Sequence, residues 1–204
     1  MQNRTKYDKI LDALQELLNQ KDIKNISVSE IARTAGIGKG SIYYYFPSKE
    51  ALVDALVERS YKKPLETARH LAEQNEISPF TRMAMIFQVC VSSSRDFRQQ
   101  DKQATTSTDD RAQALLHQKY VRYLVAELKP ELAEIIRQGI ESGDIHFDYP
   151  EALAEIALIV LTVKLDNTII PSSPEEIENT IDGLISLLEN GTGNPKGSLN
   201  FLKV

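Results

Sequence analysis

Apolar positions along the chain recur at spacings of three and four residues, and strand-like alternation of apolar and polar residues is absent. Because side chains three and four residues apart share one face of a helix, this pattern predicts an all-α fold. Polar, turn-rich stretches separate the predicted helices; Asp101–Asp110 is the clearest loop. The predicted helices span residues 5–19, 27–35, 39–46, 48–75, 79–95, 111–142, 150–164 and 174–190.

The second and third predicted helices are short and have clear end signals. Ser27 and Glu30 fit the S-x-x-E capping box, in which each side chain bonds the backbone N–H of the other residue. Gly36 can turn left-handed past the end of the second helix, and Pro47 ends the third because it disfavours helical geometry at the residue before it. Together they form the helix-turn-helix pattern, whose second helix enters the DNA major groove.

The third helix lies in GKGSIYYYF, residues 38–46, which holds three consecutive tyrosines. At about 100° per residue, Ile42 and Phe46 share an inner face with Tyr45 at its edge. Phenolic hydroxyls can donate to phosphate and the rings can lie against sugars and thymine methyls, so outward tyrosines are candidate DNA contacts. The alternative is that the tyrosines fill a core, as aromatic residues at helical spacing usually do. The residues predicted to point outward are Gly40, Ser41, Tyr43 and Tyr44.

Charge is distributed unevenly along the 204 residues. The chain has a formal net charge of -5, which disfavours general binding to nucleic acid. Residues 1–50, however, carry a net charge of +2 and the remainder carries -7, which suggests two parts with different partners. The N-terminal stretch MQNRTKYDK has no secretory signal, and Ile156–Val163, the longest apolar run, is too short to span a membrane. We therefore expect a cytoplasmic protein that does not associate with membranes.

The sequence offers little for catalysis or metal binding. Cys90 is the only cysteine, and its apolar surroundings favour an inert, buried thiol. His70, His117 and His146 lack the spacing of a metal site on one helix, and motifs for a nucleophilic serine or a phosphate-binding loop are absent. We expect no enzyme activity, no metal and no cofactor.

Residues 26–56, ISVSEIARTAGIGKGSIYYYFPSKEALVDAL, resemble the DNA-binding segment of the TetR family of bacterial transcriptional repressors. In that family a short helix and a Gly turn lead into a T/S-φ-Y-x-Y/H-F stretch (φ apolar), followed by K-E/D-x-L. Further along, Gly143–Leu161 is similar to the family's entry into its penultimate helix. The resemblance implies that the third helix makes base and backbone contacts and that residues at the starts of the second and fourth helices contact phosphates. The implied contacts are Lys39, Gly40, Ser41, Tyr43, Tyr44 and Tyr45 on the third helix, with Ser27 and Lys49 as phosphate contacts.

The resemblance also implies a larger helical domain that binds a small ligand and dimerises through its last two long helices. Residues 150–164 are apolar on more than one face and residues 174–190 carry an apolar stripe, which favours a dimer interface over an internal bundle core. Phe80–Val91 is apolar almost all round, as expected for a buried central helix. It would form one wall of a pocket for a mainly apolar or aromatic ligand, although core packing explains the same residues. The candidate pocket residues are Phe80, Met83, Phe87, Val91, Tyr120, Tyr123 and Leu124.

These patterns lead to one interpretation of the whole chain. We expect a helix-turn-helix DNA-binding domain over residues 1–48, a helical ligand-binding and dimerisation domain over 49–190, and a mobile tail over 191–204. The expected function is transcriptional regulation by a homodimeric repressor that binds a palindromic operator and is released by a small effector. Two alternatives remain open: a helix-turn-helix interaction protein controlled by a protein partner, and an all-helical enzyme.

Overall fold

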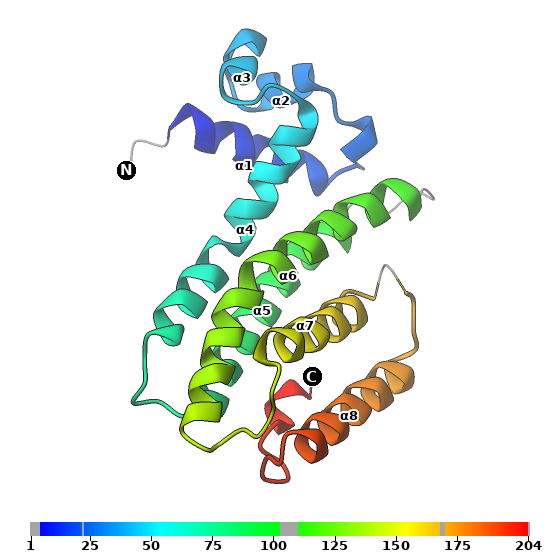
Figure 1. The fold of residues 1–204 in the computed structure, drawn as a ribbon. Coiled ribbons are helices and arrows are strands. Elements are labelled where there is room, and N and C mark those ends of the chain that lie inside the picture. Colours follow the sequence, from blue (N-terminus) through cyan, green and yellow to red (C-terminus); the bar gives the residue numbers. More distant parts are fainter. Residues whose placement is uncertain (1–4, 22, 103–109, 168–169, 204) are drawn as a thin grey trace. The chain divides into compact units, whose positions relative to one another are not determined.

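The computed structural model describes residues 5–21, 23–102, 110–167 and 170–203, and among these it describes only the backbone for 94–102, 110–117 and 166. Within the residues that the structure describes, the chain forms helices and no strand, which confirms the all-α prediction (Figure 1). Each predicted helix is present, although the fifth extends beyond its expected end, and most of the expected loop 101–110 lies outside the described residues. The elements are α1 (Lys6–Leu18), η1 (Ile23–Asn25), α2 (Val28–Thr34), α3 (Lys39–Tyr45), α4 (Lys49–Ala72), α5 (Pro79–Lys102), α6 (Asp110–Glu141), α7 (Pro150–Asp166), α8 (Pro174–Gly191) and η2 (Asn200–Leu202).

The chain divides into two compact units. The first comprises Met1–Ser60 and Ser94–Lys119, and the second comprises Tyr61–Ser93 and Tyr120–Val204. The first unit therefore continues beyond residue 48, where the sequence suggested a boundary. The physical reason is that the first half of α4 carries buried apolar residues, which are Leu52, Val53, Ala55, Leu56 and Val57.

The N-terminal part of the first unit is a small bundle in which α1 contacts α2 and α2 contacts α3. Capping boxes begin α1 and α2: Thr5 pairs with Asp8, and Ser27 pairs with Glu30. Each box satisfies backbone N–H groups that the first turn of a helix leaves unpaired. The bundle buries apolar side chains of both helices, namely Ile10, Leu11, Leu14, Leu17 and Leu18 from α1 and Ile31 and Ala32 from α2.

Two clusters of buried apolar side chains hold the second unit together. One joins α6, the following loop and α7 through Ala133, Ile136, Ile145, Leu153 and Ala154. The other joins α7, α8 and the C-terminal segment through Leu161, Ile181, Leu184, Ile185, Leu199 and Leu202. Phe80 of α5 and Leu188 of α8 pack against both clusters, so the two form one continuous core.

Arg82 of α5 is almost completely buried in this unit. Its Nη1 donates to the backbone oxygen of Leu71 at 3.3 Å and to Oε1 of Gln138 at 2.5 Å. Burial lowers the pKa of the guanidinium from its ordinary value, and nearby Glu134 acts in the opposite direction. A buried charge is tolerated only with hydrogen-bond partners, so Arg82 links the end of α4 with α5 and α6.

The C-terminal segment is folded, contrary to the mobile tail expected over residues 191–204. Residues 192–203 turn back onto α8, and both Leu199 and Leu202 are buried. The carboxylate of Glu189 accepts hydrogen bonds from the backbone N–H groups of Gly197 at 2.8 Å and Leu199 at 3.1 Å. The turn-rich composition suggested mobility, but the apolar side chains at its end complete the core cluster with α8.

Candidate functional site

The helix-turn-helix forms where the sequence predicts it. Gly36 adopts a left-handed conformation with a φ of 66°, which glycine reaches without a Cβ clash. The N–H of Ile37 then bonds the backbone oxygen of Ala32 at 3.0 Å, which closes the end of α2. Helix α3 ends where the N–H of Phe46 bonds the oxygen of Ile42 at 2.8 Å, immediately before Pro47. These turns fix α3 at both ends.

Helix α3 has one buried face and one exposed face, as its helical phase predicts. Ile42 is buried within α3, and Phe46, at its C-cap, is also buried. The side chain of Tyr43 is 50% exposed and that of Tyr44 is 83% exposed. The prediction that these two tyrosines face outward is confirmed, and the alternative that they fill a core is wrong.

Tyr45 lies between the two faces, with 38% of its surface exposed. Its ring meets the ring of Tyr44 edge-on, with centroids 5.0 Å apart and an interplanar angle of 88°. It also meets Tyr7 of α1 edge-on at 6.3 Å, and Tyr7 packs on the buried Phe46 at 4.9 Å. The sequence placed Tyr45 at the margin of the inner face but gave no signal that Tyr7 would reach it.

The first turn of α3 is open to solvent. Lys39 and Gly40 are exposed, and a Cβ added to Gly40 would meet no atom within 4 Å. Glycine inside a helix costs about 1 kcal/mol relative to alanine, so packing within the chain gives no reason for glycine here. An open, unbranched surface next to a lysine suits close approach by another backbone. Ser41, which follows, is half-buried.

The two expected phosphate contacts are tied into the framework of the first unit. The hydroxyl of Ser27 accepts the N–H of Glu30 at 3.2 Å in the capping box. The ammonium of Lys49 donates to the backbone oxygen of Ile23 and is partly buried, and this burial lowers its pKa. An ammonium has three donors, so the bond to Ile23 leaves two for an external group.

The candidate pocket residues fall into two groups within the second unit. Phe80, Met83 and Phe87 of α5 pack against the core clusters described above, and Phe87 meets Phe201 of the C-terminal segment edge-on at 6.2 Å. Tyr120 and Leu124 of α6 are buried, and the Tyr120 ring lies 5.6 Å from that of Tyr61. Val91 and Tyr123 are half-buried. An effector pocket at these residues stays a prediction.

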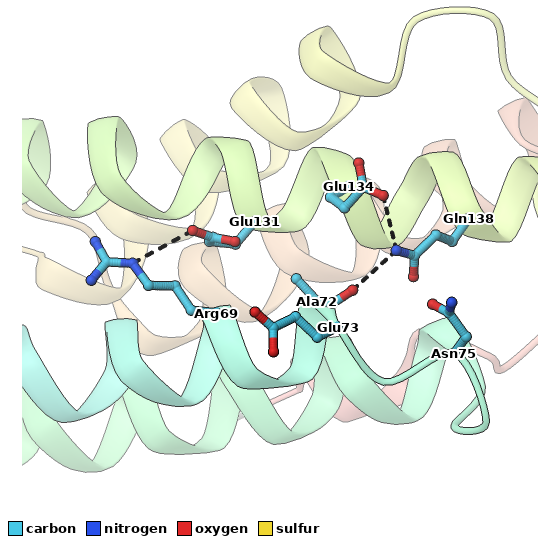
Figure 2. Close-up of a pocket in the computed structure, with 7 residues that line it drawn as sticks. All are labelled: Arg69, Ala72, Glu73, Asn75, Glu131, Glu134 and Gln138. Atoms are coloured by element: carbon cyan, nitrogen blue, oxygen red, sulfur yellow. Dashed lines mark hydrogen bonds and ion pairs between the residues drawn. The ribbon is translucent and has the colours of Figure 1, made fainter.

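A groove of about 520 Å³ opens elsewhere in the second unit, between the ends of α4 and α6 (Figure 2). Its walls are mostly polar, and their side chains largely bond one another. Gln138 Nε2 donates to Glu134 at 2.9 Å and to the backbone oxygen of Ala72 at 3.0 Å, and Arg69 lies 3.6 Å from Glu131. Glu73 and Asn75 also line the groove, and no predicted pocket residue does.

Other chemistry is limited in the part of the chain that the structure covers. No group of three or more His, Cys, Asp or Glu side chains among those residues is arranged to hold a metal ion. None of the helices described is both long and apolar enough to cross a membrane. Burial raises the pKa of the Cys90 thiol to about 12, so the thiolate needed for cysteine chemistry is scarce at neutral pH.

A compact helix-turn-helix with an exposed second helix defines the class of DNA-binding regulators. Residues 10–56 match the family of bacterial regulatory proteins, tetR family, and residues 93–183 match the tetracyclin repressor-like C-terminal domain. The chain belongs to the TetR family of bacterial transcriptional regulators.

Individual relatives agree most closely with this chain over short matches. An uncharacterised HTH-type transcriptional regulator of Bacillus subtilis, YvdT, is 42% identical over 57 residues, which make up 28% of this chain and 29% of that protein. The match thus spans less than a third of that relative's length. The fatty acid metabolism regulator protein of the same organism is 24% identical over 155 residues, 71% of this chain and 73% of that one.

The fold matches solved repressor structures over nearly the whole chain. SmeT, the repressor of the Stenotrophomonas maltophilia multidrug efflux pump SmeDEF, is 13% identical with a TM-score of 0.65 over 96% of this chain and 93% of that one. Its complex with triclosan gives 15% identity and a TM-score of 0.66 over 96% and 94%. At such identities the likeness concerns the fold alone.

Proposed function

We propose that this protein is a ligand-responsive repressor that binds a palindromic operator as a homodimer. In this proposal residues 1–48, supported by the start of α4, read the DNA, and residues 49–190 bind a small effector and form the dimer. The observation that carries the proposal is the outer face of α3, where Tyr43 and Tyr44 are exposed beside a lysine and an open glycine. That face offers hydrogen-bond donors, flat rings and a positive charge, which suit a major groove.

The proposed DNA contacts differ in what each can offer. Tyr43 and Tyr44 present rings and hydroxyls to base edges and sugars, and Lys39 neutralises a phosphate. Gly40 lets the two backbones approach each other. Ser41 and Tyr45 lie at the margin of this face, while Ser27 and Lys49 flank it. Lys49 contacts a phosphate with the donors that its bond to Ile23 leaves over. Ser27 contacts a phosphate by turning its hydroxyl away from the Glu30 carboxylate, to which it donates at 3.0 Å in the free chain.

The dimer interface is proposed on the outer faces of α7 and α8. Ile156 and Ile159 of α7 and Leu187 of α8 are large apolar side chains that remain exposed in the single chain. Gly183 lies one turn before Leu187, and a Cβ added there would meet no atom within 4 Å. Exposed apolar side chains next to a small residue let two helices pack closely, as in a four-helix dimer core.

The effector is proposed to be mainly apolar or aromatic and to bind beside α5. Phe80, Met83 and Phe87 supply an apolar wall in a unit whose fold resembles a repressor solved with triclosan. Release of the operator requires the effector to bind the non-DNA-binding state more tightly. The coupling is reciprocal, so operator DNA weakens the effector by the same factor.

The proposal is tested by selecting a duplex from a randomised double-stranded DNA library with the wild-type protein. We expect a two-fold symmetric consensus and a binding constant for the selected duplex that falls steeply with salt, because phosphate contacts release counterions. A scrambled duplex of equal composition is the control. Failure to bind either duplex at low salt would leave the protein-partner alternative in place of the repressor.

A further inference from the structure

The rings of Tyr7, Tyr45 and Tyr44 form a series of contacts that begins on α1 and ends on the exposed face of α3. Tyr7 packs on buried Phe46 at 4.9 Å and meets the edge of Tyr45 at 6.3 Å; Tyr45 then meets Tyr44 at 5.0 Å with nearly perpendicular planes. Exposure is greatest at the last ring of the series, since Tyr44 is 83% exposed whereas Tyr45 and Tyr7 are 38% and 37% exposed. Edge-to-face geometry is the favourable arrangement for such rings.

We infer that Tyr7 is a positioning residue for operator recognition, which it promotes by holding Tyr45 and, through it, Tyr44 in the orientation that meets DNA. This inference rests on the proposed function, because it assumes that α3 reads the operator. Tyr7 contacts no DNA in this account; its ring acts through the next two rings.

The physical basis is preorganisation of an exposed side chain. A tyrosine ring in water samples several rotamers, and fixing it on binding costs conformational entropy that a ring already held does not lose. Neither Ile42 nor the rest of the α3 core can hold Tyr44, which points away from them. The described contact that restrains the Tyr44 ring is the one with Tyr45, and Tyr45 in turn rests against Tyr7.

Burial of Tyr7 supports the same view. Tyr7 is 37% exposed, so the rest of its surface is covered, and this partial burial is the main cause that raises the pKa of its phenol, with nearby Glu58 adding to the effect. A competing explanation is that Tyr7 merely covers Phe46 as an apolar lid, and two substitutions at the same position separate the explanations.

The test compares Tyr7→Leu, which keeps apolar bulk but removes the ring, with Tyr7→Phe, which keeps the ring. Affinity is measured for the duplex selected by the wild-type protein and for its scrambled counterpart. Tyr7→Leu should lower the affinity for the selected duplex by about tenfold. The DNA-binding domain of each of the two subunits loses a factor of about three in affinity with one aromatic contact. Tyr7→Phe should bind like the wild type, and affinity for the scrambled duplex should change little in either variant.

A second readout follows the rings without DNA. In protein labelled with ¹³C-tyrosine, the ring signals of Tyr44 should move towards those of free tyrosine in Tyr7→Leu and stay in place in Tyr7→Phe. Tyr149→Leu is the matched control, because it removes an exposed ring that meets Phe147 edge-on in the other unit. It should leave both the affinity and the Tyr44 signals unchanged.

The outcomes separate the two claims. If the wild type binds neither duplex, the proposed function fails. If the wild type binds its selected duplex and Tyr7→Leu binds it equally well, the inference fails while the proposed function stands. The inference is also overturned if Tyr7→Phe loses as much affinity as Tyr7→Leu, or if both duplexes weaken equally.

Discussion

An aromatic ring that stays in water forgoes the stabilisation that burial would contribute, about 1.5–3 kcal/mol for a large apolar side chain. On α3, Ile42 and the C-cap residue Phe46 gain that contribution, whereas Tyr43 and Tyr44 do not. The two exposed tyrosines therefore add little to the folding of the first unit. Substitutions at these positions can separate binding from stability, which substitutions at Ile42 cannot.

Tyr44→Ala is expected to abolish detectable binding to the selected duplex while the thermal midpoint shifts very little. The reason is that the side chain is 83% exposed and contributes almost no buried surface. Electrophoretic mobility shift and thermal unfolding by circular dichroism measure the two effects. Tyr43→Ala, at 50% exposed, should behave similarly with a somewhat larger midpoint shift. Unfolding of the first unit by either substitution would mean that these rings are part of its core.

The environments of single residues show which features of the site the sequence can predict and which it cannot. Helical phase within α3 is local, so it was sufficient to predict the faces of Ile42 and Tyr44. The environment of Tyr45 depends on Tyr7 of α1, and that of Lys49 depends on the backbone oxygen of Ile23. Both partners lie far away along the chain, and periodicity within one helix carries no information about them.

At the scale of elements, the capping box of α2 makes the first unit sensitive to acid. The pKa of Glu30 falls to about 2 from an ordinary 4.5, first because Lys21 bonds the carboxylate and then because the N–H of Ser27 does. A lowered folded-state pKa means that the carboxylate stabilises the fold above pH 4.5. That stabilisation is lost as the pH falls from 4.5 towards 2.

Glu30→Gln tests this dependence, because glutamine still fits the capping box but does not titrate. The variant should be less stable than the wild type at neutral pH, and the difference should close as the pH falls from about 4.5 to about 2. Urea unfolding at a series of pH values measures the free energy of unfolding of each protein. A difference that stays constant over this range would contradict the assignment to Glu30.

The C-terminal segment stabilises the second unit through its buried leucines. Leu202→Ala should lower the free energy of unfolding by about 2–5 kcal/mol, the range for removing a well-buried leucine side chain. Ile170→Ala is the control, since removing an apolar side chain that is 53% exposed and lies outside the proposed dimer interface should cost no more than about 0.5 kcal/mol. Equal effects of the two substitutions in urea unfolding would show that residues 192–203 do not complete the core.

Element boundaries were predictable where a local signal existed. Ser27 and Pro47 lie at helix ends as a cap and a breaker, and the observed ends lie within a residue or two of the expected ones. Helix α5 continues past its expected end without such a signal. The folded C-terminal segment was missed because its order comes from Glu189 and the α8 cluster, which are tertiary contacts that composition does not show.

At the scale of the whole molecule, repression as proposed needs two DNA-binding domains, one from each subunit, on one operator. A dimer converts the second domain's binding into an intramolecular step, which raises the overall affinity by roughly 10²–10⁴ over one domain. A chain with a formal net charge of -5 benefits from this linkage, since only residues 1–50 carry a positive excess. Dimerisation and operator affinity should therefore fail together when the outer face of α8 is disrupted.

Leu187→Glu places a charge at the centre of the proposed interface and should produce a monomer. Sedimentation velocity should show a single chain that keeps its helical circular dichroism, and affinity for the selected duplex should fall by about 10²-fold or more as the DNA-binding domains separate. Ser186→Glu adds the same charge at an exposed position about 100° around the helix, and it should remain a dimer. At the proposed interface, the glutamate of each subunit would be buried without a partner. If Leu187→Glu nevertheless remains a dimer with full affinity, the subunits associate through a different surface.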